Sequence, residues 1–276
     1  MAARVRGAPP TPLARRRAPA LLALLLLAAC DRGAPDPRAA TATRALAAAV
    51  AALSAADAPA MEPGEAWLLQ RLARARPDDA ALGALMARTE QRLAGHRAAR
   101  LLQPDAAPFA LPEDPGRGIV RLATYIFAPV GAPAARAAAF IDDFTATPGV
   151  GYVLTHQWLV LEWAHGLGLG LPAAVAARRD DLLERIAAEQ RADSQFSDLF
   201  AERAALLLAF GQPSAAAAGG WVEVIAAAQP ADGRWVSGRS ALAYDGQHAT
   251  ASHPWVHTTG FVAAAMGFYL EREGGS

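Results

Sequence analysis

Cysteine is almost absent from this sequence: Cys30 is the only one among 276 residues, and lysine and asparagine do not occur at all. A single thiol cannot form an internal disulfide, so the chain must fold without covalent cross-links. The roughly 245 residues that follow Cys30 are enough to bury a core that makes such cross-links unnecessary. If Cys30 is itself modified, cysteine nucleophiles and cysteine metal ligands are excluded as well.

Two further kinds of pattern are scarce. Downstream of Cys30 the sequence has no uninterrupted apolar stretch of the roughly 20 residues that a membrane-spanning helix needs. The alternating pattern of strands is almost missing, so the expected fold class is all-α. Taking the five arginines of the first 17 residues from the 26 basic residues leaves 21 against 26 acidic ones. This mildly acidic balance argues against nucleic acid as a partner.

The first thirty residues have the three parts of a secretory leader. Arginines at positions 15–17 precede the apolar run 20–29, which is too short to span a bilayer as a mature helix. The run ends in Leu-Ala-Ala-Cys at positions 27–30, which resembles the lipobox of bacterial lipoproteins. The resemblance implies a signal peptide at 1–29, lipidation of Cys30, and a protein anchored to a bacterial membrane that faces the periplasm or the exterior. An ordinary signal peptide or an uncleaved anchor is the alternative.

The rest of the chain is a series of helical patterns separated by turns that contain glycine or proline. A tether at 30–38 precedes an N-terminal helical region, 39–102, and an irregular stretch with four prolines, 103–118, leads into a C-terminal region, 118–276. The patterns predict helices at 41–56, 63–74, 77–95, 118–127, 133–146, 151–169, 172–191, 196–210, 213–228 and 254–270. Apolar and charged helices alternate, as expected of inner and outer layers in stacked α-hairpins.

Four segments of the C-terminal region occur in a characteristic order. They are YVLTHQ from position 152, FSDLFAERAALLLAFG from 196, AAQPADGRW from 227 and HTTGFVAAA from 257. Together they resemble the core of α/α-toroid proteins of the terpenoid cyclase and prenyltransferase-like superfamily, in an uncharacterised bacterial branch. The segment 229–235 is similar to the QW motif of squalene cyclases. The resemblance covers about 120 residues, 151–270, and implies an α/α toroid, complete or incomplete.

Two chemistries of that superfamily are not carried over to this sequence. Class II terpene cyclases protonate a double bond with an Asp-x-Asp-Asp motif, and pairs such as Asp142-Asp143 lack its spacing. Protein prenyltransferases hold zinc with Asp, Cys and His, whereas the only cysteine here is the predicted anchor. The resemblance therefore implies a fold without implying either reaction.

Four side chains are expected to meet at one mouth of such a barrel. His156, Asp198, Glu202 and His257 fall in early turns of predicted inner helices, which run nearly parallel in a toroid. Asp198 and Glu202 are four residues apart and hence on one helix face. Two imidazoles with carboxylates suit a divalent metal such as zinc, or a general acid–base pair. The alternative is a structural cluster in which the same groups only satisfy one another.

Aromatic residues gather around the polar loop that precedes the last predicted helix. Three residues there are candidates for lining a ligand site: Trp235, Trp255 and Asp232. The two tryptophans are candidates because aromatic faces stack on sugars or apolar ligands. Bracing of the loop in the manner of a QW motif, with a simple turn at Asp232-Gly233, is the alternative.

Two functions of different classes fit these observations. The first is a lipid-anchored binding or scaffold protein whose barrel recognises a cell-envelope ligand or protein. The second is a hydrolase or lyase with a His/carboxylate site, with or without metal, acting on a polysaccharide, peptide or lipid-derived substrate. The lack of a recognisable nucleophile or of a complete acid motif favours the first slightly.

Overall fold

Helices make up all the regular structure in residues 36–236 and 254–274, the parts of the chain that the computed structural model describes. The α-helices are α2 (Pro37–Ser54), α3 (Pro63–Ala75), α4 (Ala80–Leu93), α5 (Gly118–Gly131), α6 (Ala134–Ala146), α7 (Tyr152–Gly166), α8 (Ala173–Ala176), α9 (Arg178–Ala192), α10 (Asp198–Phe210), α11 (Ala215–Ala227) and α12 (Pro254–Gly274), with one 3₁₀ turn, η1 (Ala99–Leu101). No strand occurs in these ranges, so the predicted all-α class is confirmed.

Capping residues explain where several helices begin. Pro63 starts α3, and Glu62 and Glu65 form a reciprocal capping box around it. Ser197 caps α10 by accepting a hydrogen bond from the Phe200 amide at 3.0 Å. The prediction that α4 begins at Pro77 was wrong by three residues, because the Asp79 carboxylate caps the helix and accepts the Leu82 amide at 3.0 Å.

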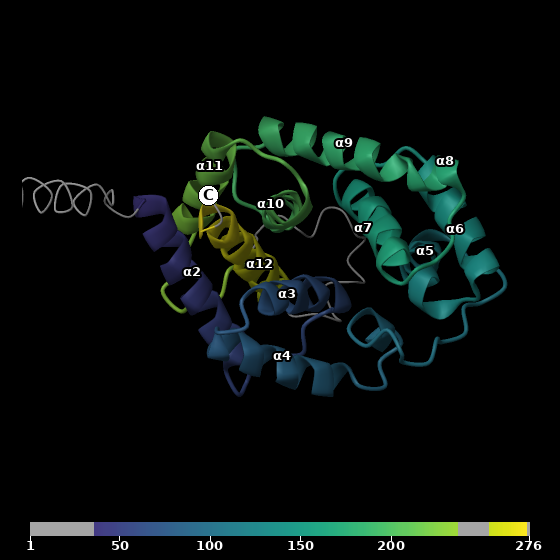
Figure 1. Ribbon diagram of the computed structural model, residues 1–276, viewed down its shortest axis with the longest axis horizontal. Coiled ribbons are helices and arrows are strands. Elements are labelled where there is room, and N and C mark those ends of the chain that lie inside the picture. Colours follow the sequence, from purple (N-terminus) through teal and green to yellow (C-terminus); the bar gives the residue numbers. More distant parts are fainter. Residues whose placement is uncertain (1–35, 237–253, 275–276) are drawn as a thin grey trace, which may run out of the picture. The chain divides into compact units, whose positions relative to one another are not determined.

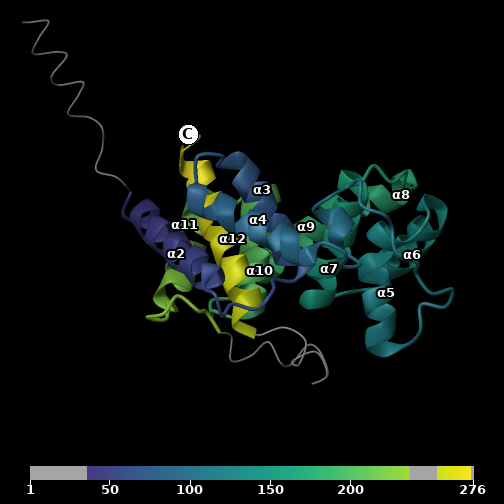
Figure 2. The same ribbon diagram turned by 90° about the horizontal axis from the view of Figure 1, so that it is seen from below.

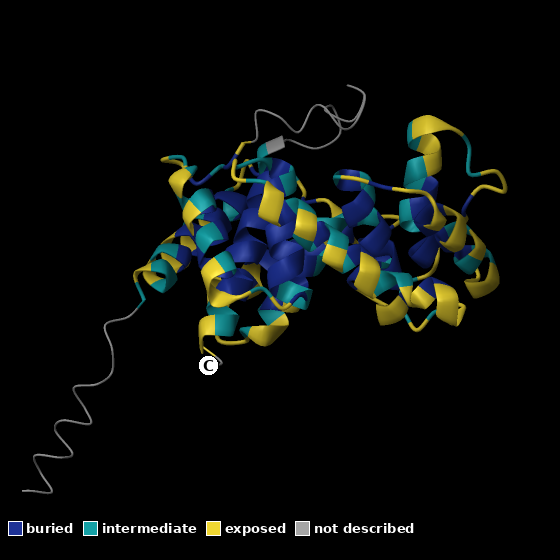
Figure 3. Cartoon of the chain, turned by 90° about the horizontal axis from the view of Figure 1, so that it is seen from above, coloured by how far each residue is buried: buried dark blue, intermediate teal, exposed yellow. Residues whose placement is uncertain are grey.

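Among α7, α9 and α10, the two apolar helices lie inside and the charged one lies outside, as their composition predicts. Helices α7 and α10 bury ten residues each, of 15 and 13, whereas α9 buries only three of its 15. Those three, Leu182, Ile186 and Gln190, are four residues apart and form the stripe that rests on α7 and α10. Figure 3 shows this contrast as dark inner helices beneath exposed outer faces. The predicted helix 172–191 is interrupted at Ala177, between α8 and α9.

The last helix packs against the first ones. Helix α12 contacts α2, α3 and α10 (Figures 1 and 2), so helices from both sides of the stretch 103–118 share one hydrophobic core. Glycines on α12 let α3 approach closely: a Cβ atom at Gly267 would lie 2.1 Å from Leu72 Cδ2, and one at Gly260 would lie 2.7 Å from Glu65 Cγ. The polar side chain of Glu65 is thereby held against α12.

None of the helices in the described ranges combines the length and the apolar character needed to cross a bilayer. Cys30, with the predicted signal peptide and most of the tether, lies outside the described residues, as does the loop 237–253.

Candidate functional site

Four helices begin at the same place in the molecule. Tyr152 is the first residue of α7, Asp198 is the first residue of α10, and Thr258 belongs to the second turn of α12. The Tyr152 hydroxyl and the Thr258 hydroxyl each donate to the Asp198 carboxylate at 2.6 Å. The expectation that these three helices start at one end is therefore confirmed. Glu65, in the first turn of α3, lies close enough to His257 to interact with its charge.

Asp198 is the centre of the polar contacts. It is buried, and His257 Nδ1 lies 2.9 Å from its Oδ1, in addition to the two hydroxyl donors. Burial by itself raises the pKa of Asp198, but the charge of His257 and the three hydrogen bonds outweigh it, so the pKa lies below its ordinary value. Asp198 is therefore an ionised carboxylate whose charge is compensated.

Glu202 lies one turn further along the same face of α10. Unlike that of Asp198, its carboxylate is not satisfied by hydrogen bonds. Its side chain is 0 % exposed, and neither carboxylate oxygen makes a hydrogen bond within the described part of the chain. The nearby Thr155 hydroxyl donates instead to the main-chain carbonyl of Tyr152 at 3.0 Å. Burial raises the pKa of Glu202, and the charges of His156 and His257, together with the nearby Thr155 hydroxyl, offset this only in part. A buried carboxyl group without partners is costly unless a proton or a cation neutralises it.

His257 joins these carboxylates to a second acidic group on α3. Burial alone lowers the pKa of His257, but the charge of Asp198 and its hydrogen bond, together with Glu65 and Glu62, raise it well above 6.5. On the α3 side of the imidazole, burial raises the pKa of Glu65 to about 8. About a fifth of the His257 side chain, 20 %, is exposed, so the cluster reaches the surface.

Three of the four predicted site residues come together in a geometry that fits a cation. Asp198, Glu202 and His257 each offer one ligand atom, and these atoms lie within 4.8 Å of one another. An imidazole and two carboxylates are a ligand set that Zn²⁺ and related divalent ions accept. Glu62, Glu65 and His257 form a second group within the same limit.

His156 is near this cluster without belonging to either group. Its Nδ1 lies 2.6 Å from the main-chain oxygen of Tyr152, one turn earlier on α7. Its charge nevertheless acts on Glu202, so the imidazole and this carboxyl are neighbours. His253, four residues before His257, lies outside the described residues.

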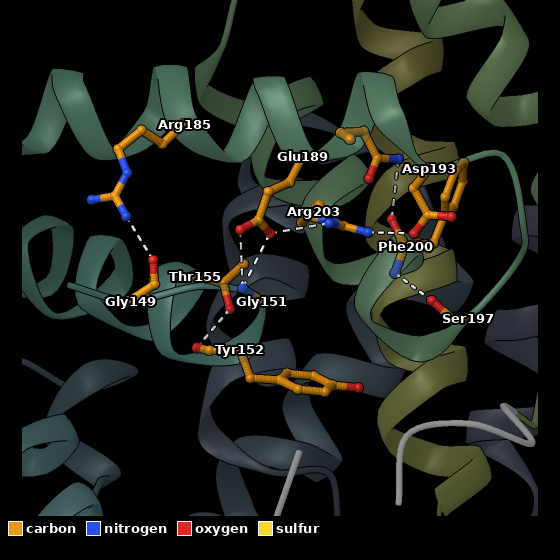
Figure 4. A network of polar contacts seen from close by, with 11 residues as sticks. Gly149, Gly151, Tyr152, Thr155, Arg185, Glu189, Asp193, Ser197, Phe200 and Arg203 are labelled. Carbon is orange, nitrogen blue, oxygen red and sulfur yellow. Dashed lines mark hydrogen bonds and ion pairs between the residues drawn. The ribbon is translucent and has the colours of Figure 1, made fainter. Parts of the chain in front are cut away.

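A separate ionic network holds the starts of α7 and α10 in place (Figure 4). Arg203 of α10 is 5 % exposed and pairs with Glu189 at 3.1 Å and with Asp193. Both Glu189 oxygens accept the amide of Gly151, the residue that precedes α7, at 3.1 Å. Gly151 has a φ of 55°, a conformation that glycine adopts without strain. The network thus fixes the backbone that presents Tyr152 to Asp198.

The predicted ligand-lining residues do not share one surface. Trp235 is fully buried, and its Nε1 donates to the Ile225 carbonyl at 3.2 Å, which braces the end of α11. Trp255 is half-buried under the Arg234 guanidinium, 4.8 Å from the ring centroid. Asp232 is exposed and accepts the Arg234 amide at 3.1 Å, as in a simple turn. These contacts favour bracing for Trp235 and a turn for Asp232.

Several residues of the cluster have no counterpart among the predicted ones. Tyr152 and Thr258 were quoted within the motifs YVLTHQ and HTTGFVAAA, but their hydroxyls carried no expectation of binding Asp198. Glu65 lies in the N-terminal helical region, outside the stretch with the toroid resemblance. Its capping-box spacing to Glu62 is the only local signal at this position, and that spacing indicates a helix start and no site.

A hollow in the described part of the chain lies away from this cluster. It is a groove of about 640 Å³ between α2 and α4, with Leu46, Val50 and Arg88 among its lining residues.

Comparisons of the chain with protein-family models, with curated proteins and with solved structures find no match. The class that fold and site define is accordingly an all-α protein with a His/carboxylate group suited to a cation.

Proposed function

We propose that this chain is a lipid-anchored protein of the bacterial cell envelope, with an α/α-toroid domain that binds a divalent cation such as zinc. Asp198, Glu202 and His257 are the proposed ligands. Through this site the domain serves as a binding or scaffold module for a cell-envelope ligand or protein.

The proposal that the domain binds a cation rests on the buried carboxylate of Glu202. Two carboxylate oxygens, fully buried and without a hydrogen bond in the described residues, lie beside Asp198 and His257. Buried polar groups are nearly always paired, and an exception calls for an explanation such as an ion. A divalent cation supplies the missing partner for Glu202 and compensates the excess of acidic groups.

The packing of α12 supports the toroid proposal. In a closed ring of α-hairpins the last inner helix must contact the first one, and α12 packs against α3. The chain also alternates between helices that are buried nearly all round and helices buried along one stripe, as seen for α7, α9 and α10. The meeting of helix starts at Asp198 is what a ring of parallel inner helices produces.

The envelope location rests on the sequence at positions 15–30. Acyl chains on Cys30 would hold the protein on the membrane by burying methylene groups. Cells that express the full chain with a labelled fatty acid should label it, and Cys30→Ser should abolish the label. Equal label in the two proteins would refute the anchor without bearing on the cation site.

One observation favours a second function, a metal-dependent hydrolase or lyase. Three protein ligands leave an open coordination position, which is typical of catalytic zinc sites and lets the ion activate a water molecule. Ester, peptide and glycoside substrates presented to the metal-loaded chain test this function, and hydrolysis that survives Glu202→Gln would exclude the proposed site.

The cation proposal is tested by metal analysis of the purified full chain in detergent. Zinc should be retained at about one ion per chain or more, and Glu202→Gln should weaken its binding at least about tenfold. Glu184→Gln is the matched control, since Glu184 is an exposed residue of the outer helix α9. A wild-type chain that binds no zinc, cobalt or manganese would overturn the proposal, as would equal binding by Glu202→Gln and Glu184→Gln.

A further inference from the structure

We propose that Glu62, Glu65 and His257 form a second cation position, on the side of the imidazole that faces α3. The inference rests on the proposed function in one respect, because His257 is shared with Asp198 and Glu202. It adds ligands from the N-terminal helices to a site whose other members lie in the C-terminal half.

Glu65 supplies the observation that points to a ligand. Its side chain is 1 % exposed, and its Oε1 accepts the Glu62 amide at 2.6 Å. Its Oε2 is buried and has no hydrogen-bond partner in the described residues. The capping box accounts for the first oxygen and leaves the second one unexplained.

The geometry places suitable atoms around that oxygen. One ligand atom each from Glu62, Glu65 and His257 lies within 4.8 Å of the others. Because His257 Nδ1 contacts Asp198 at 2.9 Å, its Nε2, on the opposite edge of the ring, is the nitrogen left for the α3 side. With only this position filled, Nδ1 keeps its proton and donates to Asp198, which orients the imidazole from behind, as carboxylates do for many metal-bound histidines. With both positions filled, Nδ1 would have to release that proton to serve the Asp198–Glu202 position, so His257 would act as a bridging imidazolate.

The backbone of α12 is adapted to this arrangement. Gly260 lies three residues after His257, and a Cβ atom there would come within 2.7 Å of Glu65 Cγ and 2.8 Å of its Cβ. The absence of a side chain at Gly260 thus creates the space that holds Glu65 beside the imidazole. Glu62 is exposed, so a cation can reach this position from solvent.

The ligand class follows from the donor atoms. Two carboxylates and one imidazole suit Zn²⁺ or Mn²⁺ and are a poor set for soft ions such as Cu⁺, which prefer sulfur. Three protein ligands leave room for water or for an anionic group of a further ligand.

Zinc titration of the full chain in detergent, followed by a competing chromophoric chelator, tests the second position. Wild type should bind about two zinc ions per chain, Glu62→Gln and Glu65→Gln about one, and Glu202→Gln should lose the other ion. Glu62 is exposed, and glutamine keeps a side-chain oxygen that can accept the Glu65 amide in the capping box, so Glu62→Gln should leave α3 intact. Far-UV circular dichroism and melting of each variant verify the fold.

Each failure has its own signature. If Glu62→Gln and Glu65→Gln both bind zinc as wild type does while Glu202→Gln loses it, the second position is refuted and the first stands. If Glu62→Gln and Glu65→Gln lose zinc while Glu202→Gln keeps it, the Asp198–Glu202 site is refuted and the second position stands. Wild-type protein that binds no zinc refutes both.

Discussion

Helix α10 takes part in two polar clusters that differ in how fully their carboxyl groups are satisfied by partners. Around Arg203, one guanidinium pairs with the carboxylates of Glu189 and Asp193, and the Gly151 amide donates to Glu189. The guanidinium Nε is the one atom of this group that lacks a partner in the described residues. Around His257, one imidazole faces the carboxyl groups of Asp198, Glu202 and Glu65, and three of their oxygens make no hydrogen bond in the described residues. The first cluster holds helices together, whereas the second is incomplete without protons or cations. The difference separates a structural network from a candidate site.

Removing the positive charge of Arg203 should have the largest effect. Arg203→Met leaves Glu189 and Asp193 without their cation, and breaking a largely buried pair from one side costs about 3 kcal/mol or more. Urea unfolding of the purified chain measures this free energy. Arg185→Met is the control, because Arg185 is only half-buried and donates to one carbonyl, that of Gly149. Equal loss in the two variants would show that the Arg203 network has no special role.

Filling the space beside Glu65 tests whether the cluster around His257, unlike the Arg203 network, serves as a cation site. Gly260→Ala forces Glu65 away from His257, and overpacking of this kind costs about 1–3 kcal/mol. We expect lower stability together with loss of zinc at the Glu62–Glu65 position. Gly64→Ala is a control without steric conflict, since no atom lies within 4 Å of a Cβ there. Unchanged zinc binding by a stably folded Gly260→Ala chain would contradict the role assigned to this glycine.

In the cluster around His257, removal of an acidic group should stabilise the metal-free protein. Glu202→Met replaces a buried carboxyl that lacks partners with an apolar side chain of similar length, which should raise the unfolding free energy by about 1 kcal/mol in EDTA. With zinc present the sign should reverse, because wild type gains stability from the bound ion and the variant does not. Destabilisation of Glu202→Met in EDTA would instead indicate that Glu202 is satisfied.

The pH dependence of stability gives the most gradual effect. The folded-state pKa of Glu65 is about 8, above the ordinary 4.5, so the folded chain holds a proton that the unfolded chain releases between these values. This contribution is fully present below pH 4.5 and is lost as pH rises toward 8, with a slope of at most about 1.4 kcal/mol per pH unit. Glu65→Gln should flatten that part of the curve in EDTA. Parallel curves for wild type and variant would contradict the raised pKa.

Much of the helical layout could be predicted from the sequence. Periodic apolar residues, prolines at helix starts and glycines after helix ends are local signals, and α3, α6, α10 and α11 begin within two residues of their predicted starts. The start of α4 was missed because two acidic residues follow Pro77, and only coordinates reveal that Asp79 is the cap. The interruption at Ala177 has no local signal of glycine or proline.

The candidate site was predictable only in part. The spacing of Asp198 and Glu202 puts them on one helix face, and the motif around His257 suggested a shared end with α10. Glu65 and its neighbour Glu62 are more than 130 residues away in sequence from Asp198. Which acid completes the surroundings of an imidazole depends on which helices become neighbours, and no local pattern encodes that.

The sequence by itself determined the all-α class, the alternation of apolar and charged helices, and the identity of the groups able to bind a cation, because these depend on residue type and spacing along the chain. Only the tertiary structure decided which of those groups have hydrogen-bond partners. Asp198 receives donors from α7 and α12, while Glu202, one turn away, lies near the Thr155 hydroxyl but makes no hydrogen bond of normal geometry within the described residues. Burial and partnership are properties of packing between distant segments, and they set the charge of each carboxyl group.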